Sequence, residues 1–263
     1  MKASIAGTEM AYETRGSGPA LLLLHAFPLG QAMWDPQMEP LARRFQVVRF
    51  DARGFGGTPP GQGLMTMERM ADDGAALLDH LGLSRAVVCG LSMGGYAALA
   101  FARRHAARLR GLVLCDTKAG ADTDEARQGR AALAEKVLKE GAGAAAEATL
   151  PKLLGATTHA QRPEVVARVR SIITANPARG IADALHGLAA RADSRPSLRE
   201  IAVPTLVVCG EEDALTPPAE STALRDGIAG SRLEMVPQAG HLSNLENPAA
   251  VNALLERFLT GLD

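Results

Sequence analysis

Short apolar runs alternate with stretches of helical periodicity along most of the 263-residue chain. The run at 20–24, ALLLL, is apolar at every position, which is typical of a strand buried on both faces of a sheet. Further runs lie at 9–14, 46–50, 86–89, 111–115, 203–210 and 232–236, and helical stretches at 32–44, 67–81, 93–104, 218–228 and 248–259. Strands that alternate with helices pair in parallel through right-handed crossovers. The pattern therefore predicts an α/β fold: an open, mostly parallel sheet with helices on both faces.

One segment, 118–200, departs from this alternation. It is rich in alanine and charged residues and has no strand-like run, and four prolines are expected to divide it into short helices: Pro151, Pro163, Pro177 and Pro196. We predict a core domain formed by 1–117 and 201–263, with 118–200 inserted after the sixth strand as a helical cap, called the cap segment below.

The apolar positions of the cap segment suggest a pocket for an apolar or small acyl group, although we expect most of them to pack the cap segment onto the core. They are Leu150, Leu153, Leu154, Val165, Val169, Ile172 and Ile173. The arginines of this segment have two interpretations, a binding site for a substrate carboxylate and a solvated face, and the second is favoured.

Composition narrows the possible functions. Hydrophobic residues make up 47% of the chain, enough for a substantial core, and the formal net charge of −1 indicates neither a nucleic-acid-binding nor a polybasic membrane surface. The first ten residues lack the apolar stretch of a secretory signal, and the apolar runs are too short to span a bilayer. A cytoplasmic protein is therefore expected.

The three cysteines show no metal-site spacing. Cys89, Cys115 and Cys209 each end an apolar run, so they are interpreted as buried free thiols, with no metal site.

A serine stands where one apolar run meets a helical stretch, in the sequence VVCGLSMGG. Gly90, Ser92 and Gly94 match the pattern G-x-S-x-G in the required context of strand, sharp turn and helix. The glycines are needed because side chains there would collide with the neighbouring strand and helix. A helix-capping serine is the alternative, but a cap has no need of the two destabilising glycines Gly94 and Gly95. We predict that Ser92 is a nucleophile at the carboxyl edge of the sheet.

A serine hydroxyl is a weak nucleophile and needs a base, and that base needs a carboxylate to orient it. His241 lies between the last strand and the last helix, on the same sheet edge as Ser92, and is the predicted base. Asp213 follows the seventh strand and is the preferred acid, because the order serine, aspartate, histidine then matches a known triad order. Asp116, directly after the sixth strand, is the alternative acid.

Backbone N–H groups are expected to complete the site. The loop at 25–28, HAFP, follows the strand ALLLL, and we predict that the Phe27 N–H and the Met93 N–H form an oxyanion hole. His25 is expected to brace this loop rather than to titrate in catalysis.

The chain as a whole resembles the α/β-hydrolase fold superfamily. HAFPLG is similar to the oxyanion loop, with Ala26 in place of the usual glycine, and FDARGFGGT is similar to the turn after the fourth strand. GLSMGG matches the nucleophile elbow, and VPTLVVCGEEDALTP and AGHLSNLENP match the acid and histidine segments. Within the superfamily, GLSMGG, the proline-divided insertion and HLSNLENP are similar to bacterial carboxylesterases and 3-oxoadipate enol-lactonases.

This resemblance and the residues together predict a serine hydrolase of carboxylic esters with small or medium apolar acyl groups, acting through an acyl-enzyme. An enol-lactone hydrolase is the main alternative. Less favoured are a perhydrolase, which usually has tryptophan where this chain has Leu91, and a ligand-binding receptor on the same scaffold. The expected partner is a small-molecule ester or lactone, with no cofactor, nucleic acid or membrane. Monomer and homodimer remain open.

Overall fold

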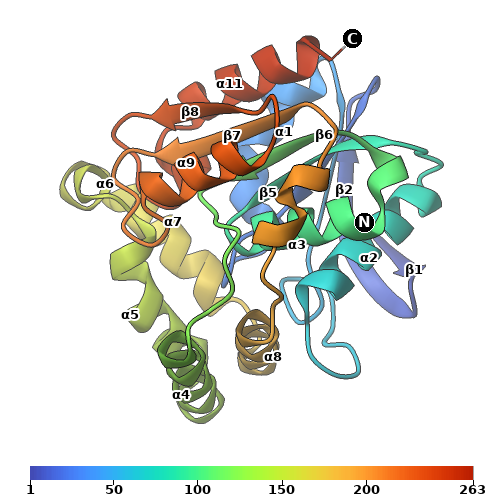
Figure 1. Ribbon diagram of the computed structural model, residues 1–263. Helices are drawn as coiled ribbons and strands as arrows, with labels where there is room; N and C mark the ends of the chain where they lie inside the picture. Colours follow the sequence, from blue (N-terminus) through green and yellow to red (C-terminus); the bar gives the residue numbers. More distant parts are fainter. Residues whose placement is uncertain (263) are drawn as a thin grey trace.

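The computed structural model describes residues 1–262, which contain a sheet of eight strands (Figure 1). The strands are β1 (Lys2–Ile5), β2 (Thr8–Arg15), β3 (Ala20–Leu24), β4 (Gln46–Phe50), β5 (Ala86–Leu91), β6 (Leu109–Cys115), β7 (Thr205–Gly210) and β8 (Arg232–Val236). Their order across the sheet is β1-β2-β4-β3-β5-β6-β7-β8. Strands β3 to β8 pair in parallel, whereas β2 is antiparallel to both β1 and β4. The mostly parallel sheet agrees with the sequence prediction.

Helices cover both faces of the sheet. They are α1 (Asp35–Ala42), α2 (Met67–His80), α3 (Met93–Arg104), α9 (Pro218–Gly227), α10 (Ser243–Glu246) and α11 (Pro248–Thr260). Figure 1 shows α11 along one face and α3 with α9 along the other. Strand β3 lies in the middle of the sheet, and each of its five residues is buried, as the apolar run predicts. Among residues 1–262 no helix is long and apolar enough to cross a membrane.

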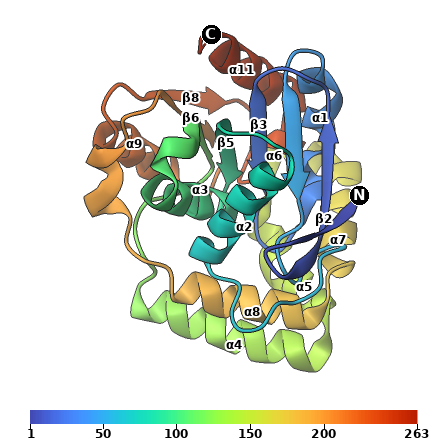
Figure 2. The same ribbon diagram turned by 90° about the vertical axis from the view of Figure 1, so that its right-hand side faces the viewer.

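Five helices of the cap segment connect β6 to β7 and lie beyond one end of the sheet (Figures 1 and 2). They are α4 (Asp124–Glu140), α5 (Ala142–Leu153), α6 (Ala156–Gln161), α7 (Pro163–Thr174) and α8 (Ala178–Ala189). Figure 2 shows α4 and α8 side by side. The prediction that Pro151 separates two helices is wrong, because it lies inside α5, near its end. Pro163 begins α7 and Pro177 precedes α8, as expected of helix-starting prolines.

Two local predictions differ from the structure. The stretch expected as one helix at 32–44 forms a 3₁₀ turn at Gln31–Trp34 followed by α1. Pro36 explains the division, because proline has no N–H to donate and fits the first turn of a helix better than its interior. Strand β1 was not predicted from the sequence. It is short, and it turns back into β2 through Ala6 and Gly7, which both have positive φ.

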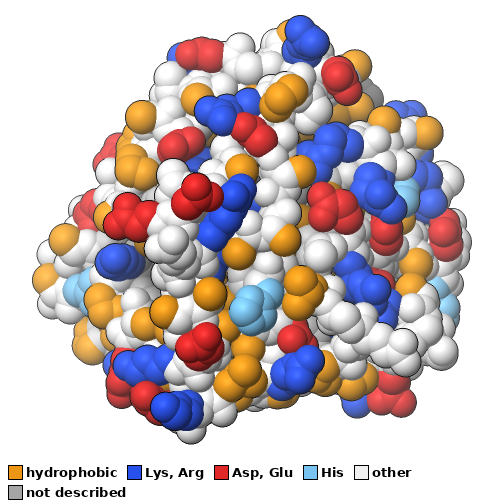
Figure 3. Space-filling view, turned by 60° about the horizontal axis from the view of Figure 1, so that its bottom comes forward, with side chains coloured by type: hydrophobic (Ala, Val, Ile, Leu, Met, Phe, Trp, Pro, Cys, Tyr) orange, Lys and Arg blue, Asp and Glu red, His pale blue; other side chains and the backbone are white. Residues whose placement is uncertain are grey.

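The surface carries charges of both signs. Figure 3 views the molecule from the side of the cap segment, and blue and red side chains are interspersed over that face. This distribution agrees with the formal net charge of −1.

Candidate active site

A sharp turn joins β5 to α3 and holds Ser92 in a strained conformation. Ser92 has φ 55° and ψ −112°, a region that residues other than glycine rarely occupy and that costs about 1–3 kcal/mol. The flanking glycines allow the turn. A Cβ on Gly90 would collide with the backbone of Gly94, and a Cβ on Gly94 would collide with the Leu24 carbonyl. The turn therefore needs the small residues that the sequence supplies, and it places the serine at the N-terminus of α3.

The structure brings Ser92, His241 and Asp213 into one chain of hydrogen bonds. Ser92 Oγ lies 2.7 Å from His241 Nε2, and His241 Nδ1 lies 2.9 Å from Asp213 Oδ2. The histidine and the aspartate are 2% and 4% exposed, so solvent does not compete for these bonds. Because a carboxylate only accepts, Nδ1 carries the imidazole proton and Nε2 accepts from the serine hydroxyl. The imidazole is oriented as a base toward the serine.

Asp213 is held by its own turn. The N–H groups of Leu215 and Thr216 donate to Oδ1 at 2.8 and 3.0 Å, and the Thr216 hydroxyl donates to Oδ2 at 2.7 Å. Burial favours the protonated form, but the hydrogen bonds from His241 and Thr216 outweigh it and hold the pKa of Asp213 below its usual value. The carboxylate therefore stays charged beside the imidazole.

Asp116, the alternative acid, contacts other groups. Its carboxylate accepts from the Gly210 N–H at 2.7 Å and from the Ser243 hydroxyl at 2.5 Å, whereas the acid that bonds His241 is Asp213. Burial, with the nearby charge of Asp213, raises the pKa of Asp116 well above its usual value. Asp116 therefore joins the end of β7 to the histidine segment, and its surroundings favour the protonated form more than those of an ordinary aspartate do.

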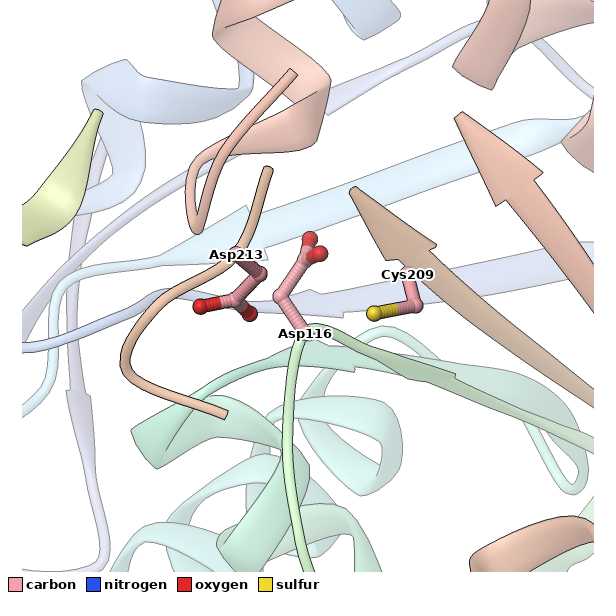
Figure 4. A group of neighbouring side chains, drawn as sticks. All are labelled: Asp116, Cys209 and Asp213. Carbon is pink, nitrogen blue, oxygen red and sulfur yellow. The ribbon is translucent and has the colours of Figure 1, made fainter. Parts of the chain in front are cut away.

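Cys209 lies beside these two aspartates, and Figure 4 shows the three side chains converging from neighbouring loops and β7. A Sγ and one oxygen of each carboxylate fall within 4.8 Å of one another. Burial raises the pKa of the Cys209 thiol to about 12, and burial also raises the pKa of Asp116. A metal ion prefers deprotonated ligands, so this cluster fits a hydrogen-bonded core better than a metal site.

The loop after β3 lies against the turn that holds Ser92, since a Cβ on Gly94 would meet the carbonyls of Leu24 and His25. Phe27 and Met93, the residues predicted to supply oxyanion N–H groups, both line the cavity that also contains Ser92 and His241. His25 is buried and braces the loop: its Nδ1–H donates to the Ala26 carbonyl at 3.0 Å, and its Nε2 accepts from the Ala52 N–H at 3.0 Å. Burial lowers the pKa of His25, so it stays neutral.

A cavity of about 370 Å³ opens above Ser92, between the core and helices α4, α5 and α8. Its walls are largely apolar, with leucines at positions 133, 153, 185, 188 and 215. Of the seven apolar cap residues considered from the sequence, Leu153 lines this cavity, and Leu150, Leu154, Val169 and Ile173 are buried in the core cluster. Of the seven residues, sequence reasoning thus named one that lines the cavity.

Three cations also line the cavity, namely Lys118, Arg130 and Lys152. Among the described residues, no carboxylate lines it. Arg130 is partly neutralised, because its Nε lies 2.5 Å from Asp122, which in turn meets Arg191 at 2.7 Å. Burial favours the protonated form of Asp122, but the hydrogen bond from Arg130 and the charges of both guanidinium groups outweigh it and hold the Asp122 pKa below its usual value. The pocket is therefore apolar with a positive rim.

Sequence reasoning missed one group that touches the proposed triad. The Thr216 hydroxyl contacts both Asp213 and, at 3.2 Å, His241 Nδ1. A signal exists in the sequence: an aspartate that caps N–H groups two and three residues later forms a local turn, and Asp213-Ala-Leu-Thr216 has that spacing.

An open parallel sheet with a strained serine turn at its carboxyl edge, faced by a histidine and an acid from later loops, defines the class of α/β hydrolases. Residues 19–248 match the model of the alpha/beta hydrolase fold family, and the chain belongs to this family. It is a hydrolase by this relationship.

Several relatives cover nearly the whole chain. It is 31% identical to 3-oxoadipate enol-lactonase 2 of Acinetobacter baylyi over 253 residues, which cover 94% of this chain and 93% of the relative. A thermophilic esterase from Thermogutta terrifontis, solved with malate bound, is 42% identical with a TM-score of 0.96, over 100% of this chain and 98% of that one. The enol-lactonase of Burkholderia xenovorans is 35% identical with a TM-score of 0.92, over 99% and 100%.

Proposed function

We propose that the protein hydrolyses carboxylic esters of small or medium apolar acyl groups through an acyl-enzyme formed on Ser92. The observation that carries this proposal is the continuous hydrogen-bonded chain from the strained Ser92 through His241 to Asp213. The likeness to a solved esterase supports it.

The proposed reaction has two halves. His241 Nε2 takes the proton of the Ser92 hydroxyl while Oγ attacks the ester carbonyl carbon, and the carbonyl oxygen becomes an oxyanion. His241 then gives that proton to the departing alkoxide, which leaves as an alcohol. In the second half His241 takes a proton from water, the resulting hydroxide attacks the acyl-enzyme, and the returned proton restores the Ser92 hydroxyl as the carboxylic acid leaves.

The protein supplies two stabilising elements for the charges of this reaction. The ionised Asp213 stabilises the imidazolium, and the N–H groups of Phe27 and Met93 bind the oxyanion at the N-terminus of α3, where the helix dipole also favours negative charge. Loss of one such N–H donor typically costs about 3–4 kcal/mol of transition-state stabilisation.

Enol-lactone hydrolysis is the second candidate function, and the positive rim of the cavity favours it. The cations Lys118, Arg130 and Lys152 suit an acyl group that carries a carboxylate. Two relatives are named enol-lactonases, and the related esterase binds malate, a dicarboxylate. The same Ser92 chemistry would open a lactone, with the leaving oxygen kept on the acyl group.

A fluorophosphonate probe tests the proposed function. Such a probe phosphorylates an activated serine, so intact mass should show one adduct on the wild type and none on Ser92→Ala. A panel of p-nitrophenyl esters and an enol-lactone, run on both proteins, then separates the two candidates by their kcat/KM. Absence of labelling, with unchanged ester hydrolysis by Ser92→Ala, would leave a ligand-binding role on this scaffold.

A further inference from the structure

A buried glutamate joins the cap segment to the histidine segment. Glu246, at the end of α10, is 3% exposed. Its Oε1 accepts from the N–H groups of Gly240 and Leu242 at 2.9 and 3.2 Å, and its Oε2 accepts from the N–H of Gly155 at 2.7 Å. Gly240 and Leu242 are the two neighbours of His241 in the chain. One carboxylate therefore holds the backbone on both sides of the proposed base and, at the same time, a residue of the cap segment.

The backbones that this carboxylate joins also lie in direct contact. A Cβ added to Gly155 would lie 2.9 Å from the Gly240 nitrogen, and a Cβ on Gly240 would strike the backbone of Leu154 and Gly155. A Cβ on Gly210, at the end of β7, would in turn strike the Gly240 carbonyl. The three glycines pack against one another: Gly155 of the cap segment contacts Gly240 of the histidine segment, and Gly240 contacts Gly210 at the end of β7. A shift of Gly155 is therefore transmitted to Gly240 without an intervening flexible side chain.

Gly155 also lies two residues after the last residue of α5, Leu153, which lines the cavity. Lys152 and Leu153, at the end of α5, face the space above Ser92. Arg162, in the same part of the cap segment, adds hydrogen bonds between the cap segment and the histidine region. It donates to the Glu246 carbonyl at 2.5 Å and to the Gln238 carbonyl at 3.2 Å. The part of the cap segment that meets the substrate is thus fastened to the segment that carries the base.

We infer that Glu246 is a positioning residue that couples the position of the cap segment, at Gly155, to the orientation of His241. The inference rests on the proposed function, because it assigns His241 its role as base. A carboxylate suits this position because three N–H groups converge on it, and only a group with two acceptor oxygens satisfies all three. The reaction is sensitive to such positioning, since a displacement of about 1 Å can cost on the order of 100-fold in rate.

The experiment compares two glutamates whose side chains bind the same part of the cap segment by hydrogen bonds. Glu246→Gln replaces one acceptor oxygen with an NH₂ donor, so at least one of the three N–H groups loses its partner. Glu212→Gln is the matched control: Glu212 accepts from the Thr157 N–H and hydroxyl of the cap segment, but its side chain bonds neither neighbour of His241. We measure kcat and KM for p-nitrophenyl acetate, the second-order rate of fluorophosphonate labelling, and Tm for each protein.

We expect Glu246→Gln to lower kcat and the labelling rate together, by roughly tenfold to 100-fold, with KM within about threefold of the wild type. Glu212→Gln should keep kcat within about twofold of the wild type, even if its Tm falls by as much as that of Glu246→Gln. The inference is overturned if Glu246→Gln labels at the wild-type rate, or if both variants lose activity equally at equal loss of Tm. Failure of the wild type itself to label would instead contradict the proposed function.

A second variant tests the coupling from the side of the cap segment and serves if Glu246→Gln does not fold. Gly155 has φ −70° and ψ 160°, so alanine fits its backbone conformation and only the contact with Gly240 and Glu212 opposes it. Gly155→Ala should also lower kcat and the labelling rate, although it touches no atom of Ser92 or His241. Combined with Glu246→Gln, it should cost less than the product of the two losses. Wild-type kcat in Gly155→Ala, or a purely multiplicative double variant, would overturn the coupling.

Discussion

Asp116 and Asp213 are two buried aspartates with carboxylate oxygens within 4.8 Å of each other, and their pKa values are shifted in opposite directions. Asp213 bonds the imidazole of His241, and Asp116 bonds the Gly210 N–H and the Ser243 hydroxyl. After burial, the charge on Asp213 is the next largest cause that raises the pKa of Asp116. One acid is therefore suited to stabilise an imidazolium, and the other to tie the acid and histidine loops together.

Replacing each aspartate by asparagine should separate these roles. Asp213→Asn leaves the shape intact but offers His241 an amide, which favours the wrong tautomer, and kcat should fall by about 10³–10⁴-fold. Asp116→Asn keeps an acceptor for the Gly210 N–H, and its NH₂ donates to the Ser243 oxygen once that hydroxyl has turned, so kcat should stay within about threefold. Steady-state kinetics on p-nitrophenyl acetate check both. A larger loss in Asp116→Asn than in Asp213→Asn would reverse the assignment of the acid.

The raised pKa of Asp116 predicts a pH dependence of stability. Its pKa is higher in the folded protein than in the unfolded chain, so the folded state binds more protons between the two values. This stabilisation is fully present below the unfolded value of about 3.9 and is lost as pH rises through the folded pKa, at about 1.4 kcal/mol per pH unit inside that window. Asparagine does not titrate, so Asp116→Asn should gain stability relative to the wild type as pH rises. Urea unfolding of both proteins from pH 4.5 to 8 measures the difference, and a pH-independent difference would contradict a raised pKa of Asp116.

A buried ion pair that should dominate local stability joins Arg53 of the FDARGFGGT turn to Asp73 of α2. Arg53 donates from two nitrogens to both oxygens of Asp73 at 2.7 Å, and both residues are buried. Asp73→Ala leaves the buried guanidinium with the Ala6 carbonyl but without a carboxylate, and it should lower the free energy of unfolding by about 3–5 kcal/mol. Glu9→Gln, which breaks the exposed Lys2–Glu9 pair, is the control and should cost no more than about 1 kcal/mol. Equal urea midpoints for the two variants would show that the buried pair is not needed.

The positive rim of the cavity predicts a preference that depends on the charge of the acyl group. Lys118→Gln and Lys152→Gln should each lower kcat/KM for a p-nitrophenyl monoester of succinate by roughly twofold to fivefold, and leave the butyrate ester unchanged. Lys139→Gln, on the exposed side of α4, is the control. The effect should shrink in high salt, which screens exposed charges. Equal losses of kcat/KM for both esters would mean that the lysines do not recognise the carboxylate of the acyl group.

Much of this molecule could be predicted from its sequence because the relevant signals are local. The run ALLLL at 20–24 predicts a doubly buried strand, and β3 is buried at every position. Gly90 and Gly94 flank Ser92 at the spacing that the turn requires, and the structure shows which backbone atoms each of them must clear. The loops with Asp213 and His241 were placed by the simple rule that the carboxyl ends of parallel strands share one edge of the sheet.

The rest depends on contacts between distant residues, which no local pattern contains. Glu246 and Gly155 are 91 positions apart and meet only because the cap segment folds back onto the histidine segment. The cavity lining has the same difficulty, because the packing of α4 against α8 and over the core decides which of their residues face Ser92. Strand β1 has little apolar character of its own and takes its place by pairing with β2.

The central claim, that Ser92 attacks the substrate, is tested most directly by the mass of the intact protein after incubation with a fluorophosphonate. The account predicts one adduct on the wild type, mapped to the peptide that contains Ser92, no adduct on Ser92→Ala, and loss of esterase activity in parallel with labelling. An unlabelled wild type, or a Ser92→Ala protein that hydrolyses p-nitrophenyl acetate at the wild-type rate, would contradict it.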